Sequence, residues 1–349
     1  MKRTTDQAIG QGQFFLVGGG IASLAAAAFL IRDANILGCR ITILEALGKL
    51  GGSLDGAGSA EDGYVIRGGR MFESKYVCTY DLFDSIPTLD GRTTVTREIF
   101  EWNETIRTTS RSRLVLDGKR VFAPDYQLTD VHLLTLARLT ICPEGRLGDS
   151  KISDHFSTDF FQTNFWVMWS TTFAFQTWHG AVEFRRYLLR FMHMVPGFNQ
   201  LRGIMRTVYN QYDSLVRPLR KWLGEHGVTF FPSTRVTDLI CDDHGEPKRV
   251  VGIVCEHGAR HVEILIDPAD AVIVTLGSMT AGTSLGGTDR AARADAYDDT
   301  GAWALWKTIA TGRSEFGNPQ AFADRVDESK WLSFTATLHD RILLLGRGD

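Results

Sequence analysis

Four residues near the N-terminus have the types and spacing of a nucleotide-binding site. Gly18, Gly20 and Ser23 follow the apolar run FFLV, and Glu45 ends a second apolar run, RITILE. In a G-x-G-x-x-G fingerprint the first glycine allows a tight turn and the second lets a pyrophosphate approach the backbone, while a small third residue permits close helix packing. A carboxylate at the Glu45 position accepts hydrogen bonds from ribose hydroxyls. This spacing predicts a dinucleotide site.

That chemistry requires a strand, a glycine turn, a helix and a second strand, in this order. Phe14–Val17 is fit for a buried parallel strand, and the alanines and leucines after the glycines favour a helix. A pyrophosphate would rest on the helix N-terminus, where free N–H groups and the dipole favour anions. The uncharged segment Phe14–Ile31 also has the hydropathy of a membrane span or signal peptide. The consecutive glycines 18–20 argue against both, because they would weaken a helix at its centre.

A second glycine loop, KLGGSLDG at Lys49–Gly56, follows the acidic strand. An ordinary surface turn would explain it, but the loop is more typical of FAD proteins than of simple NAD dehydrogenases. Further on, Asn210–Asp243 has the pattern of a helix, a glycine stop and a strand. Pro247–Ile266 has the pattern of a hairpin, and Asp270–Met279 that of a buried strand ending in glycine. This order predicts an α/β, FAD-binding two-dinucleotide (Rossmann-like) fold.

The predicted FAD-binding domain is discontinuous. It comprises residues 14–75 and 205–285, with a largely helical substrate or cap domain inserted at 76–204. Residues 286–349 form an incomplete C-terminal segment. The length of 349 residues fits two or three domains.

Composition excludes several classes of protein. The net charge of -3 provides no overall basic field to attract nucleic acid. The five cysteines are widely spread and form no C-x-x-C pair, so neither zinc nor a disulfide framework is indicated. The sequence therefore predicts a cytoplasmic protein without a metal site.

The inserted region is dense in aromatic residues. Two stripes at helical spacing run through it: Phe165, Trp169 and Phe173, then Phe184, Leu188 and Phe191. A helical core and an apolar cavity for an acyl chain explain these stripes equally well. His179 and His193 have no spaced partner that would make a metal site, so we expect them to be packing residues.

Two polar residues carry groups that an active site can use. Tyr187 lies among apolar neighbours in a predicted helix, where a phenol can donate a proton or simply point its hydroxyl at a carbonyl. Gln211, in NQYDS, can hold a carboxylate through its amide N–H, or cap the following helix.

Several stretches are similar, in chain order, to the oleate hydratases, the flavoprotein family also called myosin-cross-reactive antigens. They are GGGIASL, GYVIRGGR, NFWVMWSTTFAFQTWHGAVEFRRY, YNQYDSLVRPLRKWL, VIVTLGSMT and FGNPQAF. The resemblance implies a hydro-lyase that adds water to the cis-9 double bond of oleate-type fatty acids, giving 10-hydroxy acids. It also implies FAD bound without net redox chemistry, an unsaturated fatty acid as the partner, and peripheral contact with a membrane.

The resemblance also implies roles for individual residues. Tyr187 matches the tyrosine thought to protonate the alkene, and Gln211 matches a glutamine at the substrate carboxylate. The positions that match FAD contacts are Gly18, Gly20, Ala22, Glu45, Ser53, Val236 and Ser278. The loop with Arg67, Gly68 and Gly69 would lie where the flavin ring meets the acyl pocket.

The residue after RGGR departs from the family. Most members have a glutamate there that activates the attacking water, whereas this chain has Met71, which can neither give nor take a proton. Some actinobacterial-type members also carry methionine. We expect backbone groups and the flavin to position the water beside a methionine wall that suits a lipid chain. Glu73, which matches a second acid of the loop, is the alternative base.

The C-terminal end also departs from the family. Members continue well beyond this chain, and the segment from Arg341 does not look like their continuation. This difference predicts a truncated or frameshifted product. Two other functions stay open at this point: a flavin oxidoreductase acting on a lipid or amine, and an inactive fragment that binds FAD or lipid.

Overall fold

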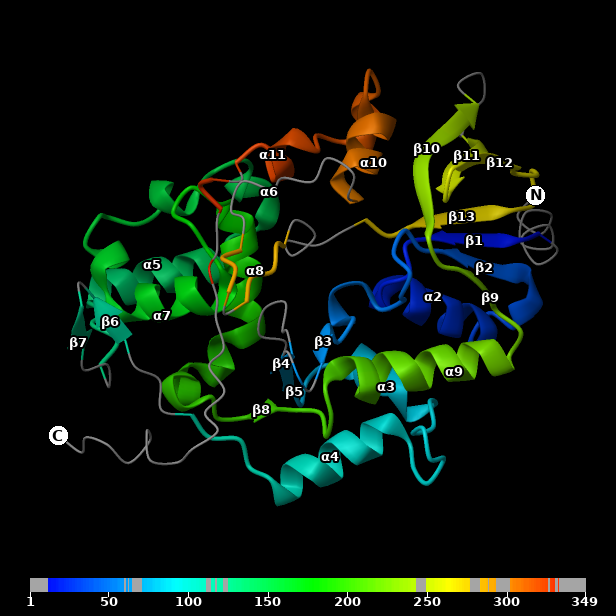
Figure 1. Ribbon diagram of the computed structural model, residues 1–349. Coiled ribbons are helices and arrows are strands. Elements are labelled where there is room, and N and C mark those ends of the chain that lie inside the picture. The colour runs from blue at the N-terminus through cyan, green and yellow to red at the C-terminus, as the bar shows by residue number, and fades with distance from the viewer. Residues whose placement is uncertain are drawn as a thin grey trace, which may run out of the picture.

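The computed structural model describes residues 12–59, 61, 63–64, 71–110, 114–116, 118–121, 125–242, 249–276, 283–287, 289–292, 302–325, 327–329 and 332. These residues form an α/β part around a parallel sheet and a mainly helical part beside it (Figure 1). The predicted site residues Arg67, Gly68, Gly69 and Ser278 lie outside the described residues.

A four-stranded parallel sheet lies at the centre of the α/β part, in the order β13-β1-β2-β9. β1 (Phe14–Val17) pairs with β2 (Ile41–Leu44) on one side and with β13 (Ala271–Val274) on the other. β9 (Thr229–Phe231) pairs with the outer side of β2. The apolar runs predicted to be buried strands are therefore neighbours in one sheet. β1 and β2 are mostly buried, whereas β13 is only partly buried.

Helices cover one face of this sheet. α2 (Ile21–Arg32) and α9 (Arg217–Glu225) lie side by side beneath it in Figure 1 and pack against each other. α2 contributes Leu24 and Ala27, both fully buried, to the core. The helix that the alanines and leucines predicted is confirmed, and its small side chains allow it to lie close to the sheet.

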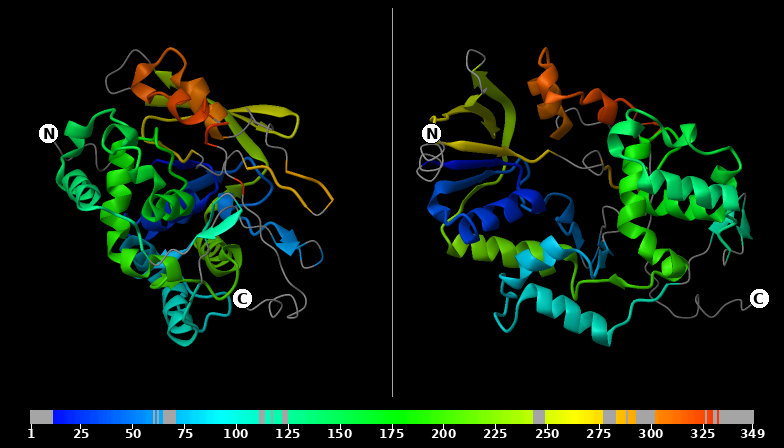
Figure 2. Two further views of the ribbon diagram at one scale, coloured as in Figure 1. Left: turned by 90° about the vertical axis from the view of Figure 1, so that its left-hand side faces the viewer. Right: turned by 180° about the vertical axis from the view of Figure 1, so that it is seen from behind.

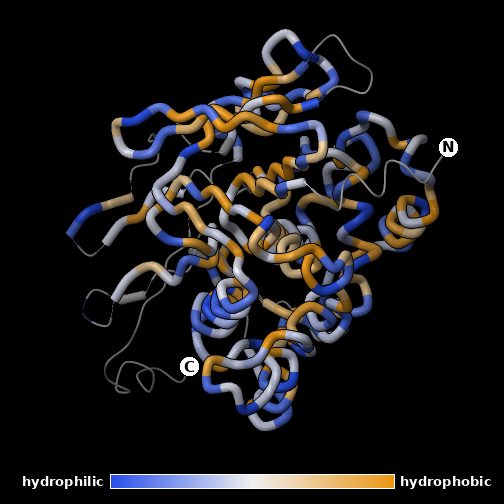
Figure 3. Tube along the Cα trace, turned by 90° about the vertical axis from the view of Figure 1, so that its right-hand side faces the viewer, coloured by the Kyte–Doolittle hydropathy of each residue, from blue (hydrophilic) through white to orange (hydrophobic). Residues whose placement is uncertain are grey.

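A second, antiparallel sheet covers the opposite face. It consists of β10 (Thr234–Asp242), β11 (Arg249–His257) and β12 (Arg260–Leu265), and α10 (Ala302–Ala310) packs against β10. The predicted hairpin is confirmed as β11 and β12. Hydrophobic segments run through the strands, and the turns that connect them are more hydrophilic (Figure 3).

The helical part is built around aromatic side chains. α5 (Asp130–Ile141), α7 (Asn164–Phe173) and α8 (Ala181–Phe191) surround them. Phe165 and Trp169 stack with ring centroids 5.4 Å apart, and Trp169 is 1% exposed. Of the two explanations for the stripes, a helical core is therefore what these residues form.

Two helices of the predicted insertion belong to the α/β core. α3 (Val77–Asp84) and α4 (Val95–Thr105) contribute buried side chains to the same cluster as α2. β5 (Phe72–Glu73) pairs with β8 (Ile204–Met205). This pairing brings the segment that follows the helical part back beside the segment that precedes it. We propose that the inserted domain begins after α4 rather than at residue 76 (Figure 2).

The remaining elements are short. They are β3 (Gly58–Ser59), β4 (Gly63–Tyr64), β6 (Leu114–Leu116), β7 (Lys119–Val121), α6 (Glu144–Leu147), α11 (Gln320–Ala323), a π-helix at Tyr212–Val216, and 3₁₀ helices at Gly38–Arg40, Gly52–Leu54, Ile152–Asp154, Phe160–Gln162, Met192–Gln200 and Ser314–Phe316. No helix in the described part of the chain is both long and apolar enough to span a membrane.

The turn after β1 provides a test of the fold. Gly18 has φ +93°, and a Cβ there would lie 2.7 Å from the carbonyl oxygen of Thr275. Gly18→Ala should lower the free energy of unfolding by about 1–3 kcal/mol more than Gly91→Ala, because of this overlap. Gly91 has φ +70° with no described atom within 4 Å of its Cβ position, so it is the matched control. Urea unfolding of both variants measures the difference; equal losses would contradict the close contact.

Candidate functional site

The two glycine loops predicted from the sequence pack against each other. The N–H of Gly51 donates to the carbonyl oxygen of Gly19 at 2.9 Å. A Cβ on Gly52 would lie 3.2 Å from the Cα of Gly20, so these backbones meet with little room for side chains. The loops form one cradle of backbone atoms after β1, the place where a pyrophosphate binds in dinucleotide folds.

The N-terminus of α2 opens onto this cradle. No described side chain caps it, so its first N–H groups are available to an anion. Ala22 is exposed on the first turn, whereas Ser23 is fully buried. The Ser23 hydroxyl lies 2.8 Å from Oγ1 of Thr275, just after β13. Ser23 therefore holds the helix against the sheet, and Ala22 faces the space in front of it.

Glu45 lies directly against the glycine turn. Its buried carboxylate accepts hydrogen bonds from the N–H of Gly19 at 2.6 Å and from the N–H of Leu47 at 2.7 Å. The carbonyl oxygen of Glu45 accepts from the N–H of Thr234 at 2.8 Å. That bond brings β10, with the buried Val236, to the same end of the sheet. The structure thus gathers these predicted residues at one place.

Gln211 lies in a segment that packs on the second glycine loop. A Cβ on Gly56 would lie 2.9 Å from Cβ of Tyr212. The Lys49 ammonium lies 3.8 Å from the centre of the Tyr212 ring, a cation–π contact. Gln211 precedes the π-helix and makes no side-chain cap hydrogen bond to it, so the capping role considered for it is not observed. Ser53 lies in the 3₁₀ helix of the same loop.

A buried carboxylate forms a second cluster, between the two parts of the molecule. Glu73 on β5 is 2% exposed, and its Oε1 lies 2.7 Å from Nη2 of Arg190 on α8. Its Oε2 accepts a hydrogen bond from the N–H of Lys75 at 2.9 Å. The hydroxyl of Tyr80 donates to the Glu73 carbonyl at 3.0 Å. The predicted alternative base is therefore held on several sides.

His193 lies beside this carboxylate, so the prediction that it only packs was wrong. Its Nε2 is 3.6 Å from Oε2 of Glu73. Spacing along the chain could not reveal the partner, because Glu73 is far away in sequence. His179 does pack, edge-on against Trp178, and burial lowers the pKa of its imidazole. In the described residues, no group of three or more His, Cys, Asp or Glu is placed to hold a metal ion.

Tyr187 stands at the edge of the aromatic core, one turn before Arg190 on α8. Its ring lies edge-on to Phe173 and Phe175, with centroids 5.2 and 5.1 Å away. The Arg190 guanidinium lies 4.7 Å over the ring of Tyr76. Burial raises the pKa of Tyr76; Arg190 opposes this shift, and Glu73 and Tyr187 add to it. These groups therefore share one electrostatic environment.

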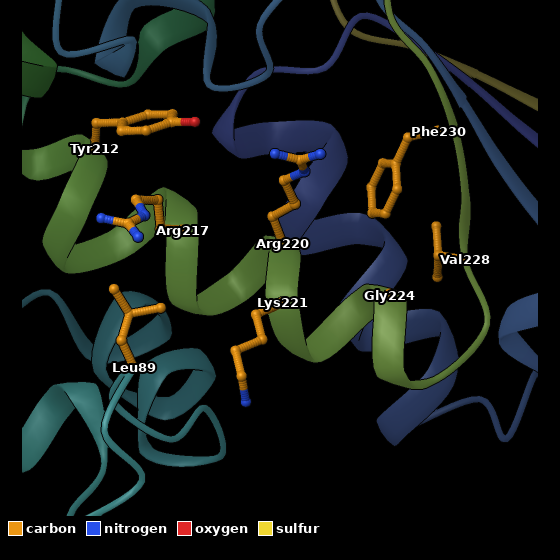
Figure 4. Close-up of a pocket in the computed structure, with 8 residues that line it drawn as sticks. All are labelled: Leu89, Tyr212, Arg217, Arg220, Lys221, Gly224, Val228 and Phe230. Atoms are coloured by element: carbon orange, nitrogen blue, oxygen red, sulfur yellow. The ribbon is translucent and has the colours of Figure 1, made fainter.

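Two hollows adjoin these sites. A cavity of about 310 Å³ is lined by Glu73, His193, Met194 and Arg202 among others. Met71, half-buried, directly precedes β5. A second hollow of about 480 Å³ runs along α9 (Figure 4). Two of its cations are already paired, Arg217 with Asp213 and Lys221 with Glu225.

Sequence reasoning missed Arg190 and His193. A signal was present, because Tyr187, Arg190 and His193 recur every three residues and a helix brings such positions to one side. The carboxylate that these residues approach is Glu73 on β5, and only the folded structure shows that it lies beside them.

The fold is an α/β fold with a parallel sheet, a glycine cradle after its first strand and an aromatic helical part beside it. Residues 11–345 match the MCRA family, and the chain belongs to that family. It is 36% identical over 337 residues to an oleate hydratase of Streptococcus pyogenes serotype M49, covering 95% of this chain and 57% of the relative. It is 32% identical over 357 residues to a linoleate hydratase of Lactiplantibacillus plantarum, covering 94% and 62%. The chain thus spans about three fifths of the length of these relatives.

A solved structure also aligns with the chain. It is an oxidoreductase from Methanosarcina mazei, with a TM-score of 0.46 and 14% identity, covering 76% of this chain and 59% of that one.

The ion pair between Glu73 and Arg190 can be tested by a double-mutant cycle. Arg190→Leu should lower the free energy of unfolding by about 1–3 kcal/mol, because it leaves a buried carboxylate unpaired. The loss should be below that of a fully buried pair, since the Arg190 side chain is 37% exposed. Adding Glu73→Gln should recover most of the loss. Additive losses in urea unfolding would show that the two groups do not interact.

Proposed function

We propose that this chain binds a nucleotide cofactor and acts as a fatty acid hydratase of the oleate hydratase type. The activity is the addition of water to the cis-9 double bond of an oleate-type unsaturated fatty acid, giving a 10-hydroxy acid. The observation that carries this proposal is family membership, with two relatives named as fatty acid hydratases. Tyr187, a phenol among aromatic rings at the edge of the helical core, supports it.

The cofactor that we propose for the cradle is FAD, as family membership suggests. Its pyrophosphate would lie on the backbone of Gly18 and Gly20 and on the first turn of α2, where the glycines leave space. The Glu45 carboxylate would accept hydrogen bonds from the ribose hydroxyls. The other proposed contacts are Ala22, Ser53, Val236, Ser278 and the loop Arg67, Gly68 and Gly69. Ser23, predicted from the sequence as a further contact, is fully buried against Thr275 and packs the helix instead. When bound, the flavin would supply a wall of the substrate site without net redox chemistry.

The residues of the chain would then act on an alkene and a water molecule. The Tyr187 hydroxyl would give its proton to one alkene carbon, while the water oxygen bonds to the neighbouring carbon. Gln211 would hold the substrate carboxylate through its amide N–H. Met71 has no lone pair basic enough to accept the proton that the water must lose.

The cofactor site is tested by Gly20→Ala. The new Cβ would meet only the Cα of Gly52, at 3.9 Å, among the described atoms, so the fold should tolerate it. The same methyl group would stand where a phosphate must approach, and we expect flavin affinity to fall at least tenfold. Flavin absorbance of the purified protein and titration with FAD measure this. Gly145→Ala, with no described atom within 4 Å, is the control; unchanged flavin content in Gly20→Ala would show that the site is misassigned.

The activity is tested by Tyr187→Phe in the full-length gene product supplied with oleic acid. Loss of the general acid should reduce hydration by about 10²–10⁴-fold while fatty acid binding persists. Tyr209→Phe is the control, because this tyrosine is 65% exposed. Mass spectrometry should show a product heavier by one water, formed without an electron acceptor. Near-normal turnover by Tyr187→Phe would rule out its role, and an oxidised product would overturn the proposed function.

A further inference from the structure

The hydration reaction needs a proton acceptor that Met71 cannot provide. Glu73 has the right chemistry but is poorly placed for it. Its side chain is 3% exposed, with Oε1 against Arg190 and Oε2 bonded to the N–H of Lys75. A water molecule therefore has little access to this carboxylate. The group that accepts the proton from water must be more exposed to this cavity than Glu73 is.

His193 meets that requirement. Its side chain is 34% exposed and lines the cavity of about 310 Å³, with its Nε2 3.6 Å from Oε2 of Glu73. A carboxylate on one nitrogen of an imidazole fixes the tautomer and turns the other nitrogen toward its target. A separation slightly beyond hydrogen-bond length is common before substrate binds. The pair thus has the arrangement of a base and the group that orients it.

We propose that His193 is the general base that takes the proton from the attacking water, and that Glu73 is the positioning residue behind it. This inference rests on the proposed fatty acid hydratase function. Glu73 from β5 lies beside His193, and Arg202 from the segment after the 3₁₀ helix lines the same cavity. Arg190 from α8 pairs with the other oxygen of Glu73. Arg190 lies near both proposed residues: it pairs with the carboxylate beside His193, and Tyr187 lies one turn before it on the same helix.

The proton balance of the reaction closes with these two residues. The O–H bond of Tyr187 breaks, and its proton bonds to one alkene carbon. The water oxygen bonds to the other carbon, and the proton released from that water goes to the imidazole of His193. This proton then returns from the imidazolium to the phenolate of Tyr187 through solvent. One water is added per turnover, both residues are regenerated, and no oxidant or reductant is used.

The test uses the full-length gene product with oleic acid as substrate. His193→Ala should lower kcat by about 10²–10⁴-fold with KM nearly unchanged. A base acts on the reacting water and does not bind the fatty acid. Imidazole added to the assay should recover part of the lost rate in His193→Ala and none in Tyr187→Phe. Glu73→Gln should reduce kcat less than His193→Ala does. His179→Ala is the matched control, since that imidazole packs against Trp178.

The outcomes separate the two proposals. If the parent protein adds no water to any cis-unsaturated fatty acid, the proposed function fails and this inference fails with it. If the parent is active and His193→Ala keeps its kcat, loses only affinity, or does not respond to imidazole, then His193 is not the base. His193→Gln serves as a second variant, judged by the same kcat and KM criteria, if the alanine variant does not fold. A loss confined to KM would assign His193 and Arg202 to substrate binding instead.

Discussion

One buried carboxylate ties the two parts of this molecule together. Glu73 lies on a strand whose neighbour Phe72 belongs to the α/β core, and its partner Arg190 lies on a helix of the aromatic core. A carboxylate this deeply buried is costly unless it is paired and hydrogen-bonded. Its requirement for a cation therefore fixes where α8 lies relative to β5. Because α8 carries Tyr187 and leads into the 3₁₀ helix with His193, the same requirement sets the geometry of both polar groups.

The two candidate sites use different physics. The glycine cradle consists of backbone groups, a helix terminus and one carboxylate hydrogen-bonded to the turn itself. The junction of the two parts has a carboxylate, a guanidinium and an imidazole close to aromatic rings. The first arrangement suits a phosphorylated ligand held without chemistry. The second suits proton transfer, because ionisable groups in a partly dry setting respond strongly to one another.

The parallel sheet and its glycine turn could be predicted from the sequence because their requirements are local. Gly18 has the positive φ that a tight turn demands, and FFLV and RITILE lie in one parallel sheet. The aromatic stripes left a choice between core and cavity, since periodicity shows which residues share a helix face and not what that face meets. Where the insertion begins also depended on tertiary packing, because α3 and α4 join the α/β core.

The second cluster escaped prediction for a related reason. The tyrosine was found through resemblance, but the imidazole was taken for a packing residue because its carboxylate comes from a distant strand. Local spacing predicts ligands that share an element. It does not predict a pair formed when a β-strand of one core meets the end of a helix from another.

The strand order of the central sheet has a consequence for synthesis on the ribosome. β1 emerges early, yet β13, one of its two partners, is among the last described strands to be made. Until then the edge of β1 that β13 will cover is unpaired, and unpaired apolar strands are prone to associate with other chains. The aromatic helical part precedes β13 in the chain, so it can fold during this interval. The nascent chain thus carries an exposed sheet edge through most of its translation, which makes it a natural client for chaperones.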